Sequence, residues 1–146
     1  MNIKQISVEL EHVYGTLYEM TTVLANNGIN IRALTVAQST DTSTVRIIVD
    51  NVIWASSVLR NMGFAPASTE VIALEVPNIP GGLNKVLEVL KNGQINIEYL
   101  YAVGSKYAHK VNNMCVIFKF TDNDRAMEVL NSAGIRMLGH GDLAAL

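Results

Sequence analysis

The sequence predicts two small α+β domains in tandem, each with the element order strand, helix, strand, strand, helix, strand. The first observation behind this prediction is a repeat: "VYGTLYEMTTVLANNGINIRAL" at residues 13–34 is similar to "IPGGLNKVLEVLKNGQINIEYL" at residues 79–100. The second is periodicity, since apolar residues recur at helical spacing in some segments of each copy and alternate in others. The length of 146 residues alone is compatible with one ordinary domain or two small ones, and the repeat decides for two.

The register of the repeat covers nearly the whole chain. Adding 66 to a residue number maps Gly15 onto Gly81 and Ile29-Asn30-Ile31 onto Ile95-Asn96-Ile97. After that point the offset grows to 71, because the segment "GSKYAHKVNN" at residues 104–113 lengthens the second copy. We therefore divide the chain into a first domain at residues 1–70 and a second domain at residues 71–146.

The elements of the first copy follow from its local patterns. Ile6, Val8 and Leu10 alternate with polar or small neighbours, as in a half-buried strand. Leu17 and later apolar residues recur every three or four positions, which indicates a helix with one buried stripe. The remaining elements are two strands rich in β-branched residues on either side of a polar turn, a helix that ends at Gly63, and an extended segment. The predicted ranges are 6–10, 17–24, 28–37, 44–50, 50–63 and 64–69.

The second copy repeats this order, and the result is the ferredoxin-like βαββαβ arrangement. Its predicted elements span residues 72–76, 83–90, 94–102, 112–121, 122–134 and 135–138. Ile47 and Ile48 are apolar neighbours in one strand, so that both faces of that strand are apolar. Since helices cover only one face of such a sheet, we expect the other face to contact a second unit or a second chain.

The composition limits the classes of partner. Charged residues make up 16% of the chain and the formal net charge is −2, so no global basic field favours nucleic acid or an anionic membrane. No apolar stretch approaches the roughly 18 residues of a membrane span, and the amino terminus lacks a secretory h-region. Cys115 is the single cysteine and cannot form an internal disulfide. The sequence thus predicts a cytoplasmic protein, and its hydrophobic content of 49% predicts some apolar surface that meets a partner.

No catalytic, cofactor or metal site is predicted. The chain has no G-x-S-x-G, Walker-type, G-x-G-x-x-G or H-E-x-x-H motif. His12, His109 and His140 are far apart in sequence and are not spaced for a metal ion. Cys115 lies in the apolar strand "MCVIF" and is interpreted as a core residue. Asp122-Asn123-Asp124 precedes a helix and is interpreted as its cap.

The helix start at residues 78–83 has the features of an anion site. A helix start offers backbone N–H groups without intrahelical partners, and Gly81 and Gly82 have no Cβ to block a ligand's approach. Asn78 and Asn96 can accept a hydrogen bond from an ammonium and donate one to a carboxylate, which suits a free amino acid. The alternative stays open that the glycines only form a turn and that Asn96 only bonds neighbouring backbone.

These residues carry a resemblance to a known family. Pro80-Gly81-Gly82-Leu83, followed by Val86, Leu90 and Ile95-Asn96-Ile97, resembles the helix start and second strand of ACT domains. The resemblance implies ferredoxin-like modules that bind amino acids at interfaces between paired copies, with no attached catalytic domain. It implies that Asn78, Ile79, Pro80, Gly81, Gly82 and Leu83 form a ligand loop and that Asn96 stands at the entrance to strand two.

The first copy departs from this pattern. Tyr14 replaces the proline, Thr16 replaces the second glycine, and His12 stands in place of the loop asparagine. The candidate residues of this copy are His12, Val13, Tyr14, Gly15, Thr16 and Asn30. We expect this copy to bind differently from the second copy or not at all.

The leading functional hypothesis is a non-catalytic regulatory or sensor protein that binds a free amino acid, mainly through the second copy. A homodimer is expected, with a metabolic enzyme as a further candidate partner. The alternative is a protein-interaction module, or a detached regulatory subunit, that binds no small molecule. Lys106, Tyr107, His109 and Lys110 in the insertion would cover a ligand, touch a partner or form a solvated hairpin.

Overall fold

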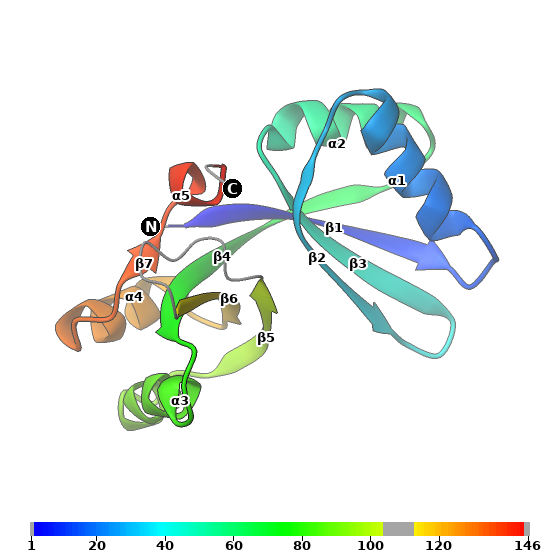
Figure 1. Ribbon diagram of the computed structural model, residues 1–146. Coiled ribbons are helices and arrows are strands. Elements are labelled where there is room, and N and C mark those ends of the chain that lie inside the picture. Colours follow the sequence, from blue (N-terminus) through cyan, green and yellow to red (C-terminus); the bar gives the residue numbers. More distant parts are fainter. Residues whose placement is uncertain (1, 104–112, 145–146) are drawn as a thin grey trace. The chain divides into compact units, whose positions relative to one another are not determined.

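A computed structural model of the protein describes residues 2–103 and 113–144 (Figure 1). The elements in chain order are β1 (Ile3–Glu11), α1 (Thr16–Asn26), β2 (Ile31–Gln38), β3 (Thr42–Val49), α2 (Val52–Asn61), β4 (Pro66–Pro77), α3 (Gly82–Asn92), β5 (Ile97–Val103), β6 (Asn113–Phe120), α4 (Asn123–Ser132), β7 (Met137–Leu138) and α5 (His140–Ala144).

The chain divides into two compact units. The first unit is Lys4–Thr69, and the second unit comprises the chain from Glu70 onward together with the first residues before Lys4. Strand β4 runs through this division, so it is the last strand of the first unit and the first strand of the second unit. The assignment of residues 1–70 and 71–146 as two domains stays a prediction.

In the first unit, β1 and β2 flank β3 in an antiparallel arrangement. Val45 of β3 lies opposite Val8 of β1 and opposite Val36 of β2. Helices α1 and α2 lie beside each other over one face of these strands (Figure 1). Their buried stripes close a core with the alternate residues of β1 and β3, consisting of Ile6, Val8, Leu10, Met20, Val23, Leu24, Val45, Ile47, Val49, Ala55, Val58 and Leu59.

The second unit repeats this plan. Strands β4 and β5 flank β6, with Leu74 opposite Val116 and Leu100 opposite Phe118, and the short strand β7 pairs with β4. The core consists of Ile72, Leu74, Val76, Val86, Leu90, Val116, Phe118, Phe120, Ala126 and Leu130. The predicted ferredoxin-like order is thereby confirmed in both copies.

Two features of the fold differ from the sequence expectation. The extended segment that ends the first copy and the strand that begins the second were predicted as separate elements, but both belong to β4. Helix α5 was not predicted, because five residues are too few to show a helical period. The side chain of Asp142 in its first turn accepts a hydrogen bond from the Gly139 N–H at 2.8 Å. Nine residues of the insertion, 104–112, lie outside the described residues, as do its Lys106, Tyr107, His109 and Lys110.

The equivalent helices of the two copies begin with the same backbone geometry. Gly15 precedes α1 with φ 89°, and Gly81 precedes α3 with φ 84°. Glycine suits both positions because other residues rarely adopt a positive φ. Asn51 and Asp122 cap α2 and α4, and each side chain accepts a hydrogen bond from a backbone N–H three residues later. Gly15 and Gly81 are related by the repeat offset of 66, and Asn51 and Asp122 are related by the offset of 71.

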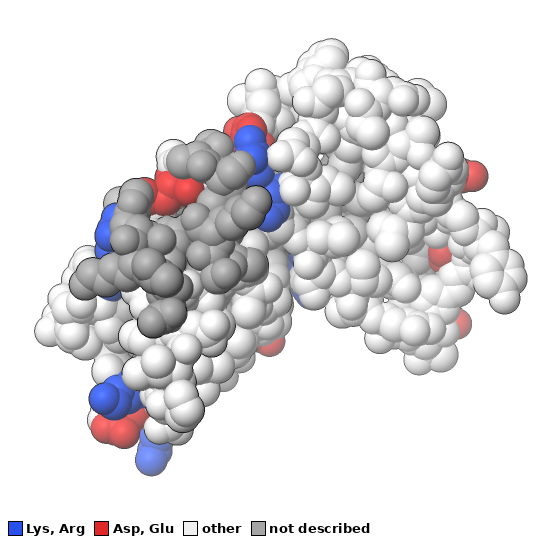
Figure 2. All heavy atoms as spheres, in the orientation of Figure 1, with Lys and Arg blue, Asp and Glu red and all other residues white. Residues whose placement is uncertain are grey.

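Charge is sparse and scattered on the face drawn in Figure 2, where most atoms belong to residues other than Lys, Arg, Asp and Glu. Within the described ranges, no helix is both long and apolar enough to cross a membrane. In the same part of the chain, no group of three or more His, Cys, Asp or Glu side chains is placed to hold a metal ion.

Candidate functional site

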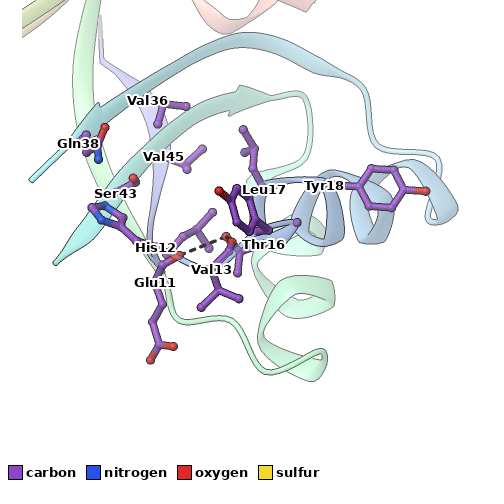
Figure 3. Close-up of a pocket in the computed structure, with 13 residues that line it drawn as sticks. Glu11, His12, Val13, Thr16, Leu17, Tyr18, Val36, Gln38, Ser43 and Val45 are labelled. Carbon is purple, nitrogen blue, oxygen red and sulfur yellow. Dashed lines mark hydrogen bonds between the residues drawn. The ribbon is translucent and has the colours of Figure 1, made fainter.

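A cavity of about 640 Å³ lies at the start of α1 in the first unit (Figure 3). This volume falls within the range of about 300–1,000 Å³ that is usual for small-molecule sites. Residues from β1, the following loop, α1, β2 and β3 surround it: Leu10, Glu11, His12, Val13, Tyr14, Gly15, Thr16, Leu17, Tyr18, Val36, Gln38, Ser43 and Val45. All of the predicted first-copy residues from His12 to Thr16 therefore line one cavity.

The loop at residues 11–16, here called the first loop, is held by its own hydrogen bonds. The Thr16 N–H donates to the Val13 carbonyl at 3.3 Å, and the Val13 N–H donates to the Glu11 carbonyl at 2.8 Å. The Thr16 hydroxyl lies within hydrogen-bond distance of both carbonyls, at 3.1 Å from Val13 and 3.3 Å from Glu11 (Figure 3). Thr16 thus shapes the loop with its hydroxyl and its amide.

The cavity has an apolar floor and a polar rim. Leu10, Val36 and Val45 come from neighbouring strands, and Leu17 comes from the first turn of α1. In Figure 3 the side chains of His12, Gln38 and Ser43 lie toward one end of the cavity, whereas the Tyr18 ring points away along the helix. A ligand at this position would place an apolar group on the floor and polar groups against the rim.

The start of α1 supplies donors for an anion. Among the described residues, the N–H groups of Tyr14 and Gly15 have no hydrogen-bond acceptor. They lie directly before an 11-residue helix, where the helix dipole places partial positive charge. A carboxylate bound there would satisfy amide donors that the fold leaves open.

The equivalent loop of the second unit, residues 77–82 and here called the second loop, has the same turn. The Gly82 N–H donates to the Ile79 carbonyl at 2.9 Å, as the Thr16 N–H donates to Val13 in the first unit. The Gly82 amide is therefore already used within the loop. A Cβ at Gly82 would lie 2.0 Å from the Pro77 carbonyl oxygen, so the lack of a side chain there serves the close packing of the loop.

The other predicted residues of the second loop differ in exposure. Asn78, Ile79, Pro80 and Gly81 are exposed, whereas Leu83 is partly buried against the second core. Pro77, the first residue of the second loop, lines a cavity on the other side of the start of α3 that is described below.

The two asparagines that enter the second strand of each copy are placed differently. The Asn96 side-chain amide donates to the Thr121 hydroxyl at 2.7 Å, and the Asn96 backbone carbonyl accepts from the Thr121 N–H at 3.2 Å. Its carboxamide therefore joins the entrance of β5 to the residue after β6, a contact that differs from both roles that the sequence left open. Asn30 is exposed and does not line the cavity of the first unit.

Sequence reasoning missed the strand residues of the cavity. Val36, Gln38, Ser43 and Val45 lie far from the first loop in sequence. Ser43 and Val45 reach it through the pairing of β3 with β1, and Val36 and Gln38 through the further pairing of β2 with β3. One signal was available: the strand that follows the polar turn at residues 38–43 pairs with the end of β1, directly before the first loop. Glu11 and Tyr18 carried no signal beyond their position beside the predicted loop.

A family model described as an ACT domain pair matches residues 1–146 of this chain. No curated protein matches the chain in sequence. The family match covers both copies of the repeat, including the first copy with its altered loop.

Solved structures share the fold over most of the chain. Protein BT0572 from Bacteroides thetaiotaomicron is 35% identical, with a TM-score of 0.91, and the match covers 100% of this chain and 98% of that one. The regulatory subunit of aspartate kinase from Thermus thermophilus is 15% identical, with a TM-score of 0.61 and coverage of 89% and 91%. E. coli aspartokinase III, in complex with lysine and aspartate, is 18% identical with a TM-score of 0.52, and the match covers 90% of this chain and 30% of that one.

Proposed function

This chain belongs to the family of ACT domain pairs, and from this membership we propose that it is a non-catalytic regulatory protein that binds a free amino acid. The observation that carries the proposal is the cavity of about 640 Å³ bounded by the first loop and the start of α1. The second loop is proposed as a second, equivalent position, because Gly81 starts α3 as Gly15 starts α1.

The chemistry of the cavity suits a zwitterion with an apolar side chain. The open N–H groups of Tyr14 and Gly15 suit a carboxylate at the positive end of α1. The carboxamide oxygen of Gln38 and the hydroxyl of Ser43 on the rim are acceptors for an ammonium group. Leu10 and Val45 on the floor are buried hydrophobic residues, which favour an aliphatic or aromatic side chain over a charged one.

Exposed apolar residues beside both loops support a site that is completed by a partner surface. Val13 and Ile79 occupy equivalent positions, and each is 59% exposed. A second copy of the chain that covered these residues would bury them and enclose the ligand. The ligand would then stabilise the assembled state, and this population shift is the proposed regulatory signal.

The test is calorimetric titration of the purified protein with each of the twenty amino acids. Lysine and aspartate belong in the panel because aspartokinase III was crystallised with them. Val36→Trp is the informative variant, since Val36 lines the cavity from an edge strand and is 45% exposed. We expect the added indole ring to occupy the cavity and weaken binding at least about tenfold, or by about 1.4 kcal/mol.

Leu34→Trp is the matched control. Leu34 lies on the same strand, is also 45% exposed and does not line the cavity. Equal loss of binding in both variants, or no heat with any amino acid, would contradict the proposal. At the second loop, Ala102→Trp and Leu100→Trp are the equivalent pair at the offset of 66. A stoichiometry that falls by half in Ala102→Trp alone would assign a second site there.

A protein-interaction module is the second candidate, and the exposed side chains of α2 favour it. Ile53 is 85% exposed and Trp54 is 48% exposed, both in the first turn of that helix. Large apolar side chains at a surface are enriched where proteins meet. Sedimentation of wild type and of an Ile53→Asp, Trp54→Ser double variant, with and without amino acids, distinguishes the two candidates. Assembly that depends on these residues and ignores every amino acid would support the module.

A further inference from the structure

A second cavity, of about 540 Å³, lies in the second unit and shares only Pro77 with the second loop. It is bounded by the end of β4, the outer side of α3 and the turn between α4 and β7. From this cavity we propose a binding site for a small organic carboxylate that carries a short apolar group. The site is independent of the amino-acid site proposed above.

A buried ionic cluster anchors one wall of this cavity. The Glu75 side chain is 7% exposed, and its Oε1 accepts a hydrogen bond from Asn113 Nδ2 at 3.0 Å. Its Oε2 lies 3.4 Å from Arg136 Nη1, while the Arg136 side chain is 54% exposed. The ion pair places the guanidinium beside Glu75, while about half of the Arg136 side chain is exposed. A guanidinium carries five N–H donors, so Arg136 can contact Glu75 and also bind a further carboxylate.

Lys85 adds a second cation to the same cavity. Within the described part of the chain, its ammonium has no hydrogen-bond or ion-pair partner. With Arg136 and Glu75, the lining carries two positive charges and one negative charge, and this excess favours a monoanion. Val86 and Val89 of α3 form the adjoining apolar wall. The arrangement thus pairs a cationic end with a short hydrophobic surface.

The first unit provides an internal comparison for this site. At the offsets of 66 and 71, Lys85 corresponds to Glu19 and Arg136 corresponds to Ala65. A smaller cavity of about 310 Å³, lined by Glu19, Val23 and Phe64 among others, lies at the corresponding place. The scaffold is therefore repeated, whereas the charge of the lining is reversed. The two cations are a property of the second unit, and they do not follow from the fold that both units share.

Sodium isovalerate is a suitable probe, and its neutral amide, isovaleramide, tests the need for charge. Backbone amide shifts of the full chain would be followed by NMR during titration with each compound. We expect saturable shifts at Ala133 and Gly134 with isovalerate, and at least about tenfold weaker binding of isovaleramide, because a charge-assisted hydrogen bond would be lost. Equal affinity for the two compounds, or tighter binding of inorganic phosphate, would overturn the proposal.

Lys85→Gln and Arg136→Gln are the informative variants, and Lys91→Gln is their control. Lys91 lies on the same helix, is exposed and does not line the cavity. We expect about tenfold weaker isovalerate binding in each informative variant and unchanged binding in the control. If the Arg136→Gln variant fails to fold because Glu75 has lost its ion-pair partner, the Lys85→Gln variant still tests the site. Equal effects of Lys85→Gln and Lys91→Gln would contradict the site. Shifts confined to Tyr14 and Gly15 would place the probe at the first loop and overturn this inference alone.

Discussion

A Cβ atom on Gly82 would lie 2.0 Å from the carbonyl oxygen of Pro77, whereas a Cβ on its neighbour Gly81 would meet nothing within 4 Å. The two glycines of the second loop therefore have different physical roles. Gly82 allows two backbone segments to approach each other. Gly81 supplies the positive φ of 84° that starts α3.

These roles predict different costs for the same substitution. Gly82→Ala should lower the free energy of unfolding by about 3 kcal/mol, because the new methyl group forces the backbone apart. Gly81→Ala should lower it by about 1 kcal/mol, because alanine fits the space but is strained at positive φ. Urea unfolding of both variants checks the prediction. Equal costs would contradict the close approach seen at Pro77.

Gln94 is the one non-glycine residue with positive φ among the described residues, at 56°. Its equivalent in the first copy is Gly28, with φ 69°. Gln94→Gly should raise the free energy of unfolding by about 0.5 kcal/mol, since relief of the left-handed strain exceeds the added entropy of the unfolded chain. Gly28→Gln is the reciprocal variant and should be destabilised. In thermal unfolding, the midpoint temperature should rise for Gln94→Gly and fall for Gly28→Gln. Shifts in the same direction would contradict this account.

The Cys115 thiol is fully buried, and burial together with the nearby Glu75 charge raises its pKa to about 12 from the usual 9.0. The unfolded chain therefore loses this proton at a lower pH than the folded chain. Stability falls as the pH rises above the unfolded value. Between pH 8 and pH 10, wild type should lose about 1.4 kcal/mol more stability than Cys115→Ala. Parallel pH profiles for the two proteins would rule out this contribution.

Hydrogen bonds from Thr44 and then Thr42 hold the pKa of the Glu9 carboxyl below its usual value. The ionised form is favoured in the folded chain, so its contribution to stability is present above the unfolded pKa and is lost as the pH falls through the folded pKa. Thr44→Val should raise the pKa of Glu9 toward its ordinary value, as measured by NMR titration. Thr35→Val, on the adjacent strand β2, is a control that should leave the Glu9 titration in place.

The order of elements could be predicted from the sequence because each one carries a local signal. Met20, Val23 and Leu24 recur at helical spacing, and they are the buried residues of α1. Asp122 was interpreted as a cap, and its side chain accepts a hydrogen bond from the Arg125 N–H at 3.1 Å. The continuity of β4 could not be predicted, because no local pattern distinguishes two short strands from one strand of 12 residues.

The candidate site was less predictable because its walls come from pairing. Sequence reasoning grouped His12 with Thr16 by adjacency, and the cavity includes both residues. It could not place Ser43 or Val36 beside them, since that requires the register of β3 against β1 and of β2 against β3. The similarity of Asn30 and Asn96 in sequence also gave no indication that Asn96 would bond Thr121, because Asp50 stands at the position of that threonine in the first copy.

Because β4 crosses from Thr69 to Glu70 without a break, the chain has no spacer at which it could be divided harmlessly. The amide of Asn2 donates to the Glu70 carboxylate at 2.8 Å, so even the first residues belong with the later half. A recombinant fragment that ends at residue 69 would lack Glu70 and would leave the Asn2 side chain without this contact. A fragment that starts at residue 71 would begin inside β4, and the loss of neighbouring strand segments would expose unpaired backbone N–H and C=O groups that favour aggregation. Studies of isolated halves therefore call for overlapping fragments or a grafted strand.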